Sequence, residues 1–189
     1  MNSQISNLLL VLGIVQVARK LDLENPDVLV YVRLGYLFTQ TIILGYFQVM
    51  YTHKIYVLID TTTLKYVEPP KPFTNEPEKP IETNNRDYDL SKVQELLKQT
   101  LIGIAFMCVL HFYWNFTQPL FIQSLLPLKN MYSNQVVQIH LFGKPAEGDL
   151  KRPFKVNSPF GSMIQQPQTD KASIKKAIKA SKAGGKKDD

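Results

Sequence analysis

The sequence predicts an all-α membrane protein with about three transmembrane helices, a kinked interfacial helix and a basic cytosolic tail. Two observations lead to this fold class. The apolar residues, which make up 44% of the 189-residue chain, gather in three stretches. About 20 helical residues are enough to cross a hydrocarbon core of about 30 Å. The second observation is a net charge of +6 that comes from the part of the chain after residue 116, as is typical of cytosolic segments of membrane proteins.

The three predicted spans cover about residues 3–18, 28–51 and 96–116. The second and third are long enough to cross a bilayer. The first is shorter and contains Gln16 among other polar residues. We expect it to thin the bilayer, to pack against partners, or to extend past Arg19 by snorkelling.

The positions of the first basic residues predict the topology. Arg19 and Lys20 follow the first apolar stretch, and no basic leader precedes it, so we expect no cleaved signal peptide. The positive-inside rule keeps Arg19 and Lys20 in the cytosol and sends Met1 across the membrane. Three spans then place residues 52–95 in the lumen and return the C-terminus to the cytosol.

Outside the spans, composition predicts less order. Residues 52–95 form a polar, proline-rich loop that we expect to lie as an extended strap, with its end leading into the third span. Pro127 interrupts the apolar residues 119–134, which predicts a kinked helix at the cytosolic interface or folded back against the bundle. Alternation over residues 135–142 predicts a short strand. The expected domains are a helical membrane domain over 1–134, a basic cytosolic segment over 135–160 and a disordered lysine-rich tail over 161–189.

Arg33 lies inside the second span, where a charged side chain costs about 2.5 to 3.5 kcal/mol on insertion scales. No acidic residue occurs within the three spans to neutralise it. The guanidinium either snorkels to the membrane surface or contacts water, lipid phosphate or another protein. Polar residues of the second and third spans each fall on one helical face, so the two faces can enclose a hydrophilic groove or only hydrogen-bond the helices together. The candidate groove residues are Arg33, Tyr36, Gln40, Gln48, His111, Asn115 and Gln118.

A second candidate site is basic and lies after the spans. It consists of Lys144, Lys151, Arg152 and Lys155, which we expect on the cytosolic side. Such charge attracts ribosomal RNA phosphates or anionic lipid headgroups, or serves topology and solubility alone.

Several classes of enzyme are excluded by motif. The chain has no phosphate-cradling glycine-rich loop, no nucleophile elbow and no His-Glu-x-x-His sequence. Its single cysteine, Cys108, and its three scattered histidines have no metal-ligand spacing. We therefore expect no enzyme activity, no cofactor and no metal.

Several longer motifs point to a family. They are Leu64-Lys65-Tyr66-Val67-Glu68-Pro69, Arg86-Asp87-Tyr88-Asp89-Leu90, Gln118-Pro119-Leu120-Phe121, and the stretch from Ile139-His140-Leu141-Phe142-Gly143-Lys144 to Lys155. In these motifs the chain resembles the fungal family of SRP-independent targeting protein 3 of the endoplasmic reticulum, also called inorganic phosphate transport protein.

This resemblance implies SRP-independent targeting and insertion of membrane proteins into the endoplasmic reticulum membrane by a multi-pass protein. The implied partners are the Sec61 translocon, other SND-pathway components and client membrane proteins. The ribosome and anionic lipids are the partners that the basic segment predicts. The alternatives are phosphate transport, maturation of phosphate transporters, or a non-catalytic translocon scaffold.

Overall fold

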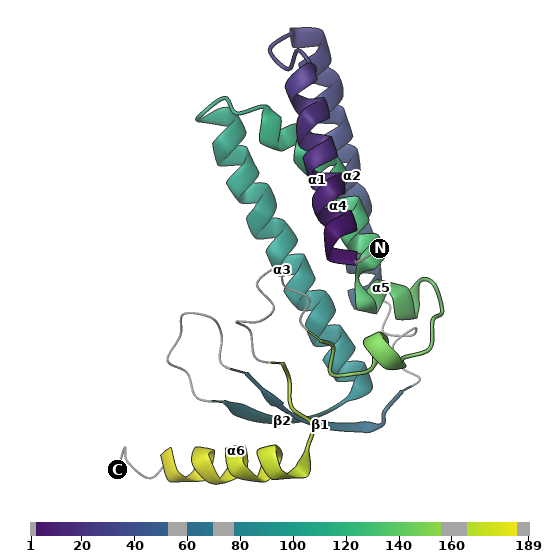
Figure 1. The fold of residues 1–189 in the computed structure, drawn as a ribbon, viewed down its shortest axis with the longest axis vertical. Coiled ribbons are helices and arrows are strands. Elements are labelled where there is room, and N and C mark those ends of the chain that lie inside the picture. Colours follow the sequence, from purple (N-terminus) through teal and green to yellow (C-terminus); the bar gives the residue numbers. More distant parts are fainter. Residues whose placement is uncertain (1–2, 53–59, 70–77, 156–165, 185–189) are drawn as a thin grey trace. The chain divides into compact units, whose positions relative to one another are not determined.

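The structure is a computed structural model, and it describes residues 3–52, 60–69, 78–155 and 166–184. The chain folds into two compact units (Figure 1). Unit 1 combines Met1–Lys54 with Ser91–Gln138, and unit 2 combines Ile55–Leu90 with Ile139–Asp189.

Unit 1 consists of long helices. They are α1 (Ser3–Lys20), α2 (Pro26–Thr52), most of α3 (Asn85–Phe112) and α4 (Gln118–Ser133). The turn between α1 and α2 ends at Asn25, whose Oδ1 accepts a 3.0 Å hydrogen bond from the Asp27 N–H. Pro26 then starts α2, where its missing N–H has no helical partner to lose. This short turn joins α1 to α2.

α4 packs along α2 and also contacts α1. One contact of α2 with α4 is made by small residues. The Thr39 hydroxyl donates a 2.6 Å hydrogen bond to the Ser124 carbonyl, and a Cβ added at Gly35 would meet the Ser124 Cβ at 4.0 Å. Gly35 and Thr39 lie one turn apart, which lets the two backbones approach closely. Helix α4 therefore matches the alternative in which this segment folds back against the bundle.

Two helices, α2 and α3, are long and apolar enough to cross a membrane. Only 28% of the apolar window of α2 and 11% of that of α3 is buried, whereas the core helix of a soluble protein is mostly buried. Large apolar side chains such as Leu37, Phe38 and Ile102 are exposed instead. These features are compatible with a membrane protein. α1 is helical as expected but is not one of these two helices, so the structure supports two spans where the sequence predicted three.

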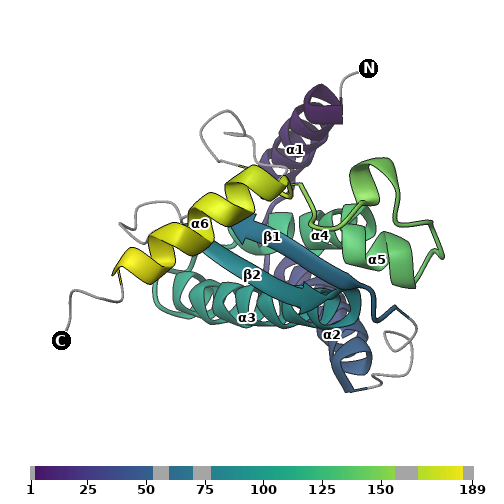
Figure 2. The same cartoon turned by 90° about the horizontal axis from the view of Figure 1, so that it is seen from below.

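Unit 2 is built on an antiparallel hairpin of β1 (Thr63–Glu68) and β2 (Lys79–Asn84). The ring of Tyr66 packs edge-on against the ring of Tyr88, with 5.6 Å between the ring centroids. The ring of Tyr88 packs in turn against Phe154, with 5.3 Å between the centroids. The backbone of Val67 exchanges two hydrogen bonds with Gln168, just before α6 (Lys171–Gly184). Figure 2 shows α6 lying along the hairpin, and it packs against both strands. The short helices α5 (Gln135–His140) and η2 (Gly148–Leu150) complete the described elements.

The hairpin corrects the all-α prediction and the prediction of an extended loop over 52–95. Exposed Thr63 and Lys65 alternate with more buried Leu64 and Tyr66, a strand pattern that the neighbouring prolines obscured, and Val67 is buried on the opposite face. Pro80 is tolerated because β2 is an edge strand of the two-stranded sheet. The end of this region leads into the third predicted span as expected, because it contains the first eleven residues of α3, which starts at Asn85.

Two further segments differ from their predictions. The predicted strand over 135–142 is the helix α5, because Asn134 caps it: its Oδ1 accepts a 3.0 Å hydrogen bond from the Val136 N–H. The predicted disordered tail contains α6. Asp170 caps that helix by accepting a 2.8 Å bond from the Ser173 N–H, and Ala177 is buried. Residues 156–165 and 185–189 lie outside the described residues.

Unit 2 also bears on the predicted topology. Its two segments flank α3 and α4 in sequence, yet they bond to each other, as between Asp89 and Arg152. A bilayer cannot separate residues that are hydrogen-bonded. The predicted arrangement, with 52–95 in the lumen and the C-terminal segment in the cytosol, therefore does not fit this fold.

Candidate functional site

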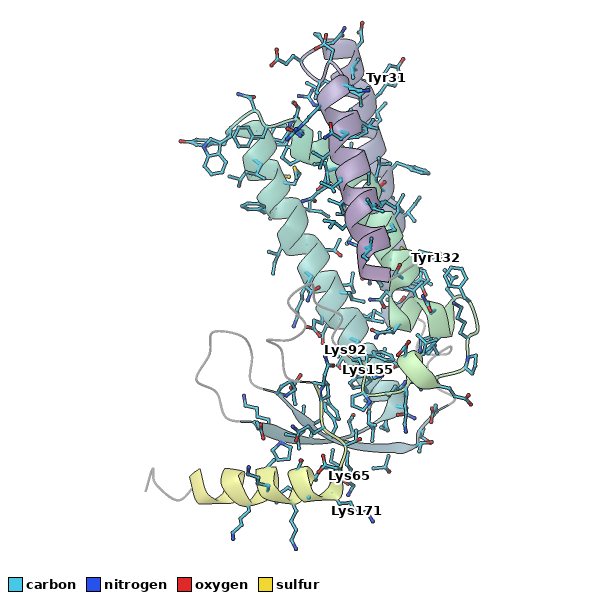
Figure 3. The ribbon with its side chains drawn as sticks, in the orientation of Figure 1. Tyr31, Lys65, Lys92, Tyr132, Lys155 and Lys171 are labelled. Atoms are coloured by element: carbon cyan, nitrogen blue, oxygen red, sulfur yellow. The ribbon has the colours of Figure 1, made fainter. Side chains whose placement is uncertain are left out.

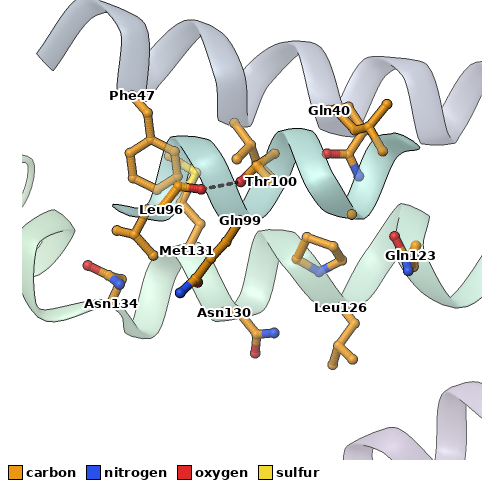
Figure 4. Close-up of a pocket in the computed structure, with 14 residues that line it drawn as sticks. Gln40, Phe47, Leu96, Gln99, Thr100, Gln123, Leu126, Asn130, Met131 and Asn134 are labelled. Atoms are coloured by element: carbon orange, nitrogen blue, oxygen red, sulfur yellow. Dashed lines mark hydrogen bonds between the residues drawn. The ribbon is translucent and has the colours of Figure 1, made fainter. Parts of the chain in front are cut away.

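Unit 1 contains a pocket of about 370 Å³ that is bordered by α2, α3 and α4 (Figure 4). Its polar lining is made of side chains that have no charge. Five carboxamides and one hydroxyl line it: Gln40, Gln99, Gln123, Asn130, Asn134 and Thr100. The other lining residues are glycine, proline or apolar, so none of the 14 is charged. We call this pocket the carboxamide groove.

Helical periodicity positions these residues. On α4, Gln123, Pro127 and Asn130 recur at intervals of four and three, which puts them on one face, and Asn134 follows as the C-cap of the helix. On α3, Thr100 satisfies its own hydroxyl by donating a 2.8 Å bond to the Leu96 carbonyl, as Figure 4 shows. On the same helix, the Gln99 carboxamide donates a 3.5 Å hydrogen bond to Glu95 Oε1.

Glycine and aromatic residues shape the rest of the groove. A Cβ added at Gly103 would meet no heavy atom within 4 Å, so the α3 wall is open at this point. On α2, Ile43 and Phe47 follow Gln40 on the same face and are buried. The groove therefore combines hydrogen-bonding groups with apolar surface, which suits a ligand with both characters.

The structure divides the predicted groove residues among different places. Gln40 is buried and lines the groove as predicted. Tyr36 instead belongs to an apolar cluster with Val32, Met107 and others. Gln48, Asn115 and Gln118 are exposed and lie outside the groove. Exposed Arg33 and buried His111 also lie outside it.

Four groove carboxamides were missed from the sequence, namely Gln99, Gln123, Asn130 and Asn134. The spacing of the three on α4 was a usable signal. It was overlooked because the segment was interpreted as a possible interfacial helix, whose polar face would meet water.

Arg33 pairs with His111 across α2 and α3. The Arg33 Nε–H donates a 3.0 Å hydrogen bond to His111 Nε2. An arginine is always a donor, so His111 is neutral with its proton on Nδ1, which lies 3.3 Å from the Phe116 carbonyl and donates to it. The partner of Arg33 is therefore a neutral imidazole, which leaves the positive charge uncompensated.

The predicted basic contact site is also divided, because Arg152 is buried in unit 2. Its Nε and Nη2 donate to both oxygens of Asp89, at 2.8 and 2.6 Å, and His140 Nε2 lies 2.7 Å from Asp89 Oδ2. The hydrogen bond to Asp89, with the charges of Asp89 and Asp60, raises the pKa of Arg152. We call Asp60, Asp89, His140 and Arg152 the ion cluster.

The three lysines of the predicted basic site are exposed. Lys155, labelled in Figure 3, lies 3.4 Å from the Asp149 carboxylate, and both side chains are largely in solvent. Lys144 and Lys151 are likewise exposed. The surface part of the predicted site is therefore Lys144, Lys151 and Lys155, without Arg152.

Comparison with known proteins identifies the family. The family model described as Phosphate transport (Pho88) matches residues 1–185. The chain is 44% identical to SRP-independent targeting protein 3 of Saccharomyces cerevisiae over 187 residues, which cover 98% of this chain and 99% of that protein. It is 35% identical to the SRP-independent targeting protein 3 homolog of Schizosaccharomyces pombe, over 93% of this chain and 91% of the relative. No solved structure matches the chain. The matches over nearly the whole sequence show that the chain belongs to the Pho88 family.

Proposed function

We propose that this protein takes part in SRP-independent targeting and inserts membrane proteins into the endoplasmic reticulum, with the carboxamide groove receiving the client. The names of the two relatives support the targeting role. The observation that carries the insertion mechanism is a groove lined by five carboxamides, between helices whose outer surfaces are apolar.

The chemistry of the groove suits insertion. A client helix carries polar flanks into hydrocarbon, where each unsatisfied polar group costs several kcal/mol. A carboxamide both donates and accepts hydrogen bonds, so it can replace water for backbone and side-chain groups of either polarity. Because the lining has no charge, it neither traps nor repels a client flank of one sign.

The size of the groove limits what it holds. At about 370 Å³ the groove lies at the lower end of the range of roughly 300 to 1,000 Å³ that is typical of pockets for small ligands. The groove therefore takes the side chains of one helical face, and the client's opposite face stays in contact with lipid. This is the arrangement expected for a client that leaves sideways into the bilayer.

We further propose that both segments of unit 2 lie in the cytosol, with α2 and α3 crossing the membrane and α4 returning the chain. Only Arg19, Lys20 and Arg33 of the 22 lysines and arginines precede the end of α2, so the positive-inside rule favours a cytosolic unit 2. Glycosylation acceptors engineered in microsomes near residue 75 and residue 182 should then both stay unmodified. An acceptor loop inserted before Asn25 should be modified; modification at only one of the first two sites would refute this arrangement.

The partners proposed for this activity are the Sec61 translocon, other SND-pathway components, the ribosome and anionic lipids. Exposed lysines support a contact with an anionic surface: Lys144, Lys151 and Lys155, and on α6 Lys171, Lys175, Lys176 and Lys179. Ribosome binding by the purified protein should weaken as salt rises. Binding that is insensitive to salt would argue against a role for these lysines.

The groove does not favour direct phosphate transport, because none of its lining residues is a cation that would hold the anion. Reconstitution of the purified protein in liposomes distinguishes the three candidate functions, which are insertase, phosphate carrier and scaffold. An insertase moves a client helix in liposomes that contain no other protein, a carrier moves phosphate, and a scaffold does neither.

The decisive variant replaces Gln40, Gln99 and Asn130 by leucine, one carboxamide from each of the three helices. We expect insertion of a single-span client, measured by protease protection, to fall several-fold because the groove becomes apolar. Gln48→Leu is the matched control, since it makes the same change on α2 at an exposed position outside the groove. Equal insertion by the triple variant and the control would sink the groove mechanism.

A further inference from the structure

The exposed aromatic residues of unit 1 mark two membrane surfaces. On α2, Tyr31 and Tyr51 are 75% and 41% exposed. They lie 20 residues apart, which at about 1.5 Å per residue is about 30 Å, the thickness of the hydrocarbon core. Tyrosine and tryptophan concentrate at membrane–water interfaces. Figure 3 shows Tyr31 near the α1–α2 turn and Tyr132, also exposed, toward the other end of unit 1.

The interface at Tyr31 continues onto α3. Tyr113 and Trp114 are exposed just beyond the end of α3, and α3 runs antiparallel to α2 in Figure 1. The bond between Arg33 and His111 fixes the register of the two helices. Tyr31 precedes Arg33 by two residues and Tyr113 follows His111 by two, so both aromatics lie on the same side of the pair.

This register sets the depth of Arg33. Two residues correspond to about 3 Å along α2, so the Arg33 backbone lies about 3 Å below the level of Tyr31. An arginine side chain easily spans that distance. The guanidinium therefore reaches the level of the phospholipid phosphates, and its position does not require an aqueous route through the membrane.

Arg33 is also prepared to bind an anion. The Nε–H of Arg33 donates its hydrogen bond to His111, which fixes the orientation of the guanidinium plane. The hydrogen bond between His111 and the Phe116 carbonyl fixes the imidazole ring in turn. Among the described residues, no carboxylate pairs with Arg33 and only its Nε is in a hydrogen bond. Its two Nη groups form the fork that matches two oxygens of a phosphate.

We propose that Arg33, held by His111, binds the phosphate of an anionic phospholipid in the leaflet at the Tyr31 end of unit 1. The bound lipid ties α2 to α3 at the end of the helices away from Tyr51. The site does not depend on the proposed insertion activity, since it needs only that unit 1 is in a membrane. Lipid phosphate and free phosphate would bind to Arg33 through the same chemistry. The experiment must therefore distinguish these two sources of the anion.

Trp114, the single tryptophan of the chain, reports on this site because it lies three residues after His111. The full chain is reconstituted in phosphatidylcholine vesicles that contain a small fraction of brominated phosphatidic acid or, separately, brominated phosphatidylcholine. We expect phosphatidic acid to quench Trp114 fluorescence preferentially. Arg33→Gln should weaken the apparent affinity for phosphatidic acid by about tenfold or more, because a charge-assisted bidentate contact is lost.

Arg19→Gln is the matched control, since it removes a cation from the last turn of α1 and should preserve the preference. Arg33→Lys covers the case in which Arg33→Gln fails to fold: it keeps the charge and should retain only part of the preference. Inorganic phosphate at millimolar concentration should leave quenching unchanged, and competition by it would overturn the assignment to lipid. The proposal also fails if Arg33→Gln keeps the full preference, or if Arg19→Gln loses it equally.

Discussion

The substitution Asp89→Asn tests the ion cluster of unit 2. Asp89 is 1% exposed and accepts two hydrogen bonds from Arg152, whose side chain is 8% exposed. Removing the carboxylate charge leaves a buried guanidinium whose remaining anion is Asp60, at 3.4 Å. Breaking a buried ion pair by removing one partner typically destabilises by about 3 to 5 kcal/mol. At about 1.4 kcal/mol per decade, this predicts a rise of 100-fold or more in the equilibrium constant for local opening.

Hydrogen–deuterium exchange on the full chain in detergent measures this effect locally. The amides of β1 and β2 should exchange about 100-fold faster in Asp89→Asn, while amides of α2 should be unchanged because unit 1 does not contain the cluster. Asp87→Asn is the matched control: it makes the same chemical change on the first turn of α3, where the side chain is 56% exposed. Unchanged exchange in Asp89→Asn, or equal effects of both variants, would refute the reasoning.

Two further predictions follow from the packing and the electrostatics. Hydrogen bonds from Thr62 and Asn85 and the charge of Arg152 lower the pKa of Asp60, against desolvation, which raises it. Since its folded pKa lies below the unfolded value, Asp60 stabilises unit 2 above about pH 4 and this contribution is lost as the pH falls through the folded pKa. Asp60→Asn should therefore reduce the drop in melting temperature between pH 5 and pH 3, and an unchanged drop would contradict the assignment. In unit 1, Gly35→Leu should lower the melting temperature in detergent by overpacking the α2–α4 contact, at a cost of about 1 to 3 kcal/mol. Gly35→Ala should be tolerated, because its Cβ would meet Ser124 at an ordinary 4.0 Å, and equal melting of the two variants would show that the contact is not close.

The long apolar helices were the most predictable part of the fold. Apolar stretches long enough to span a bilayer determine helices almost without tertiary help, because the backbone must satisfy its own hydrogen bonds there. The span predicted over residues 28–51 lies within α2. The β-hairpin was not predicted, because the strand at Thr63–Glu68 becomes stable only through its pairing with residues 79–84 and through the contact of Tyr66 with Tyr88. Both depend on contacts distant in sequence.

In the candidate sites, too, local features could be predicted from the sequence, whereas contacts between distant segments could not. A polar residue such as Gln40 can be placed on a helical face from the sequence, but its partners depend on which helix packs opposite. The neighbour of Arg33 was sought among acids within the spans and proved to be His111, 78 positions away. Arg152 was assigned to the surface because it lies among lysines, yet the carboxylate that buries it, Asp89, belongs to a different segment.

The separation of charge from the groove has a functional consequence. Were Arg33 in the groove, its charge would hold acidic client flanks and repel basic ones, so insertion would depend on client charge. In the structure the cation is held by His111 at the level of the interfacial aromatics, and the groove keeps only neutral carboxamides. Insertion through this groove should therefore vary little between clients with acidic and basic flanks of equal length. Introducing Gln40→Arg should create a charge preference that the natural groove lacks, and comparing the insertion of paired clients in liposomes measures it. A strong charge preference already present in the unaltered protein would show that the neutral groove is not the path that clients take.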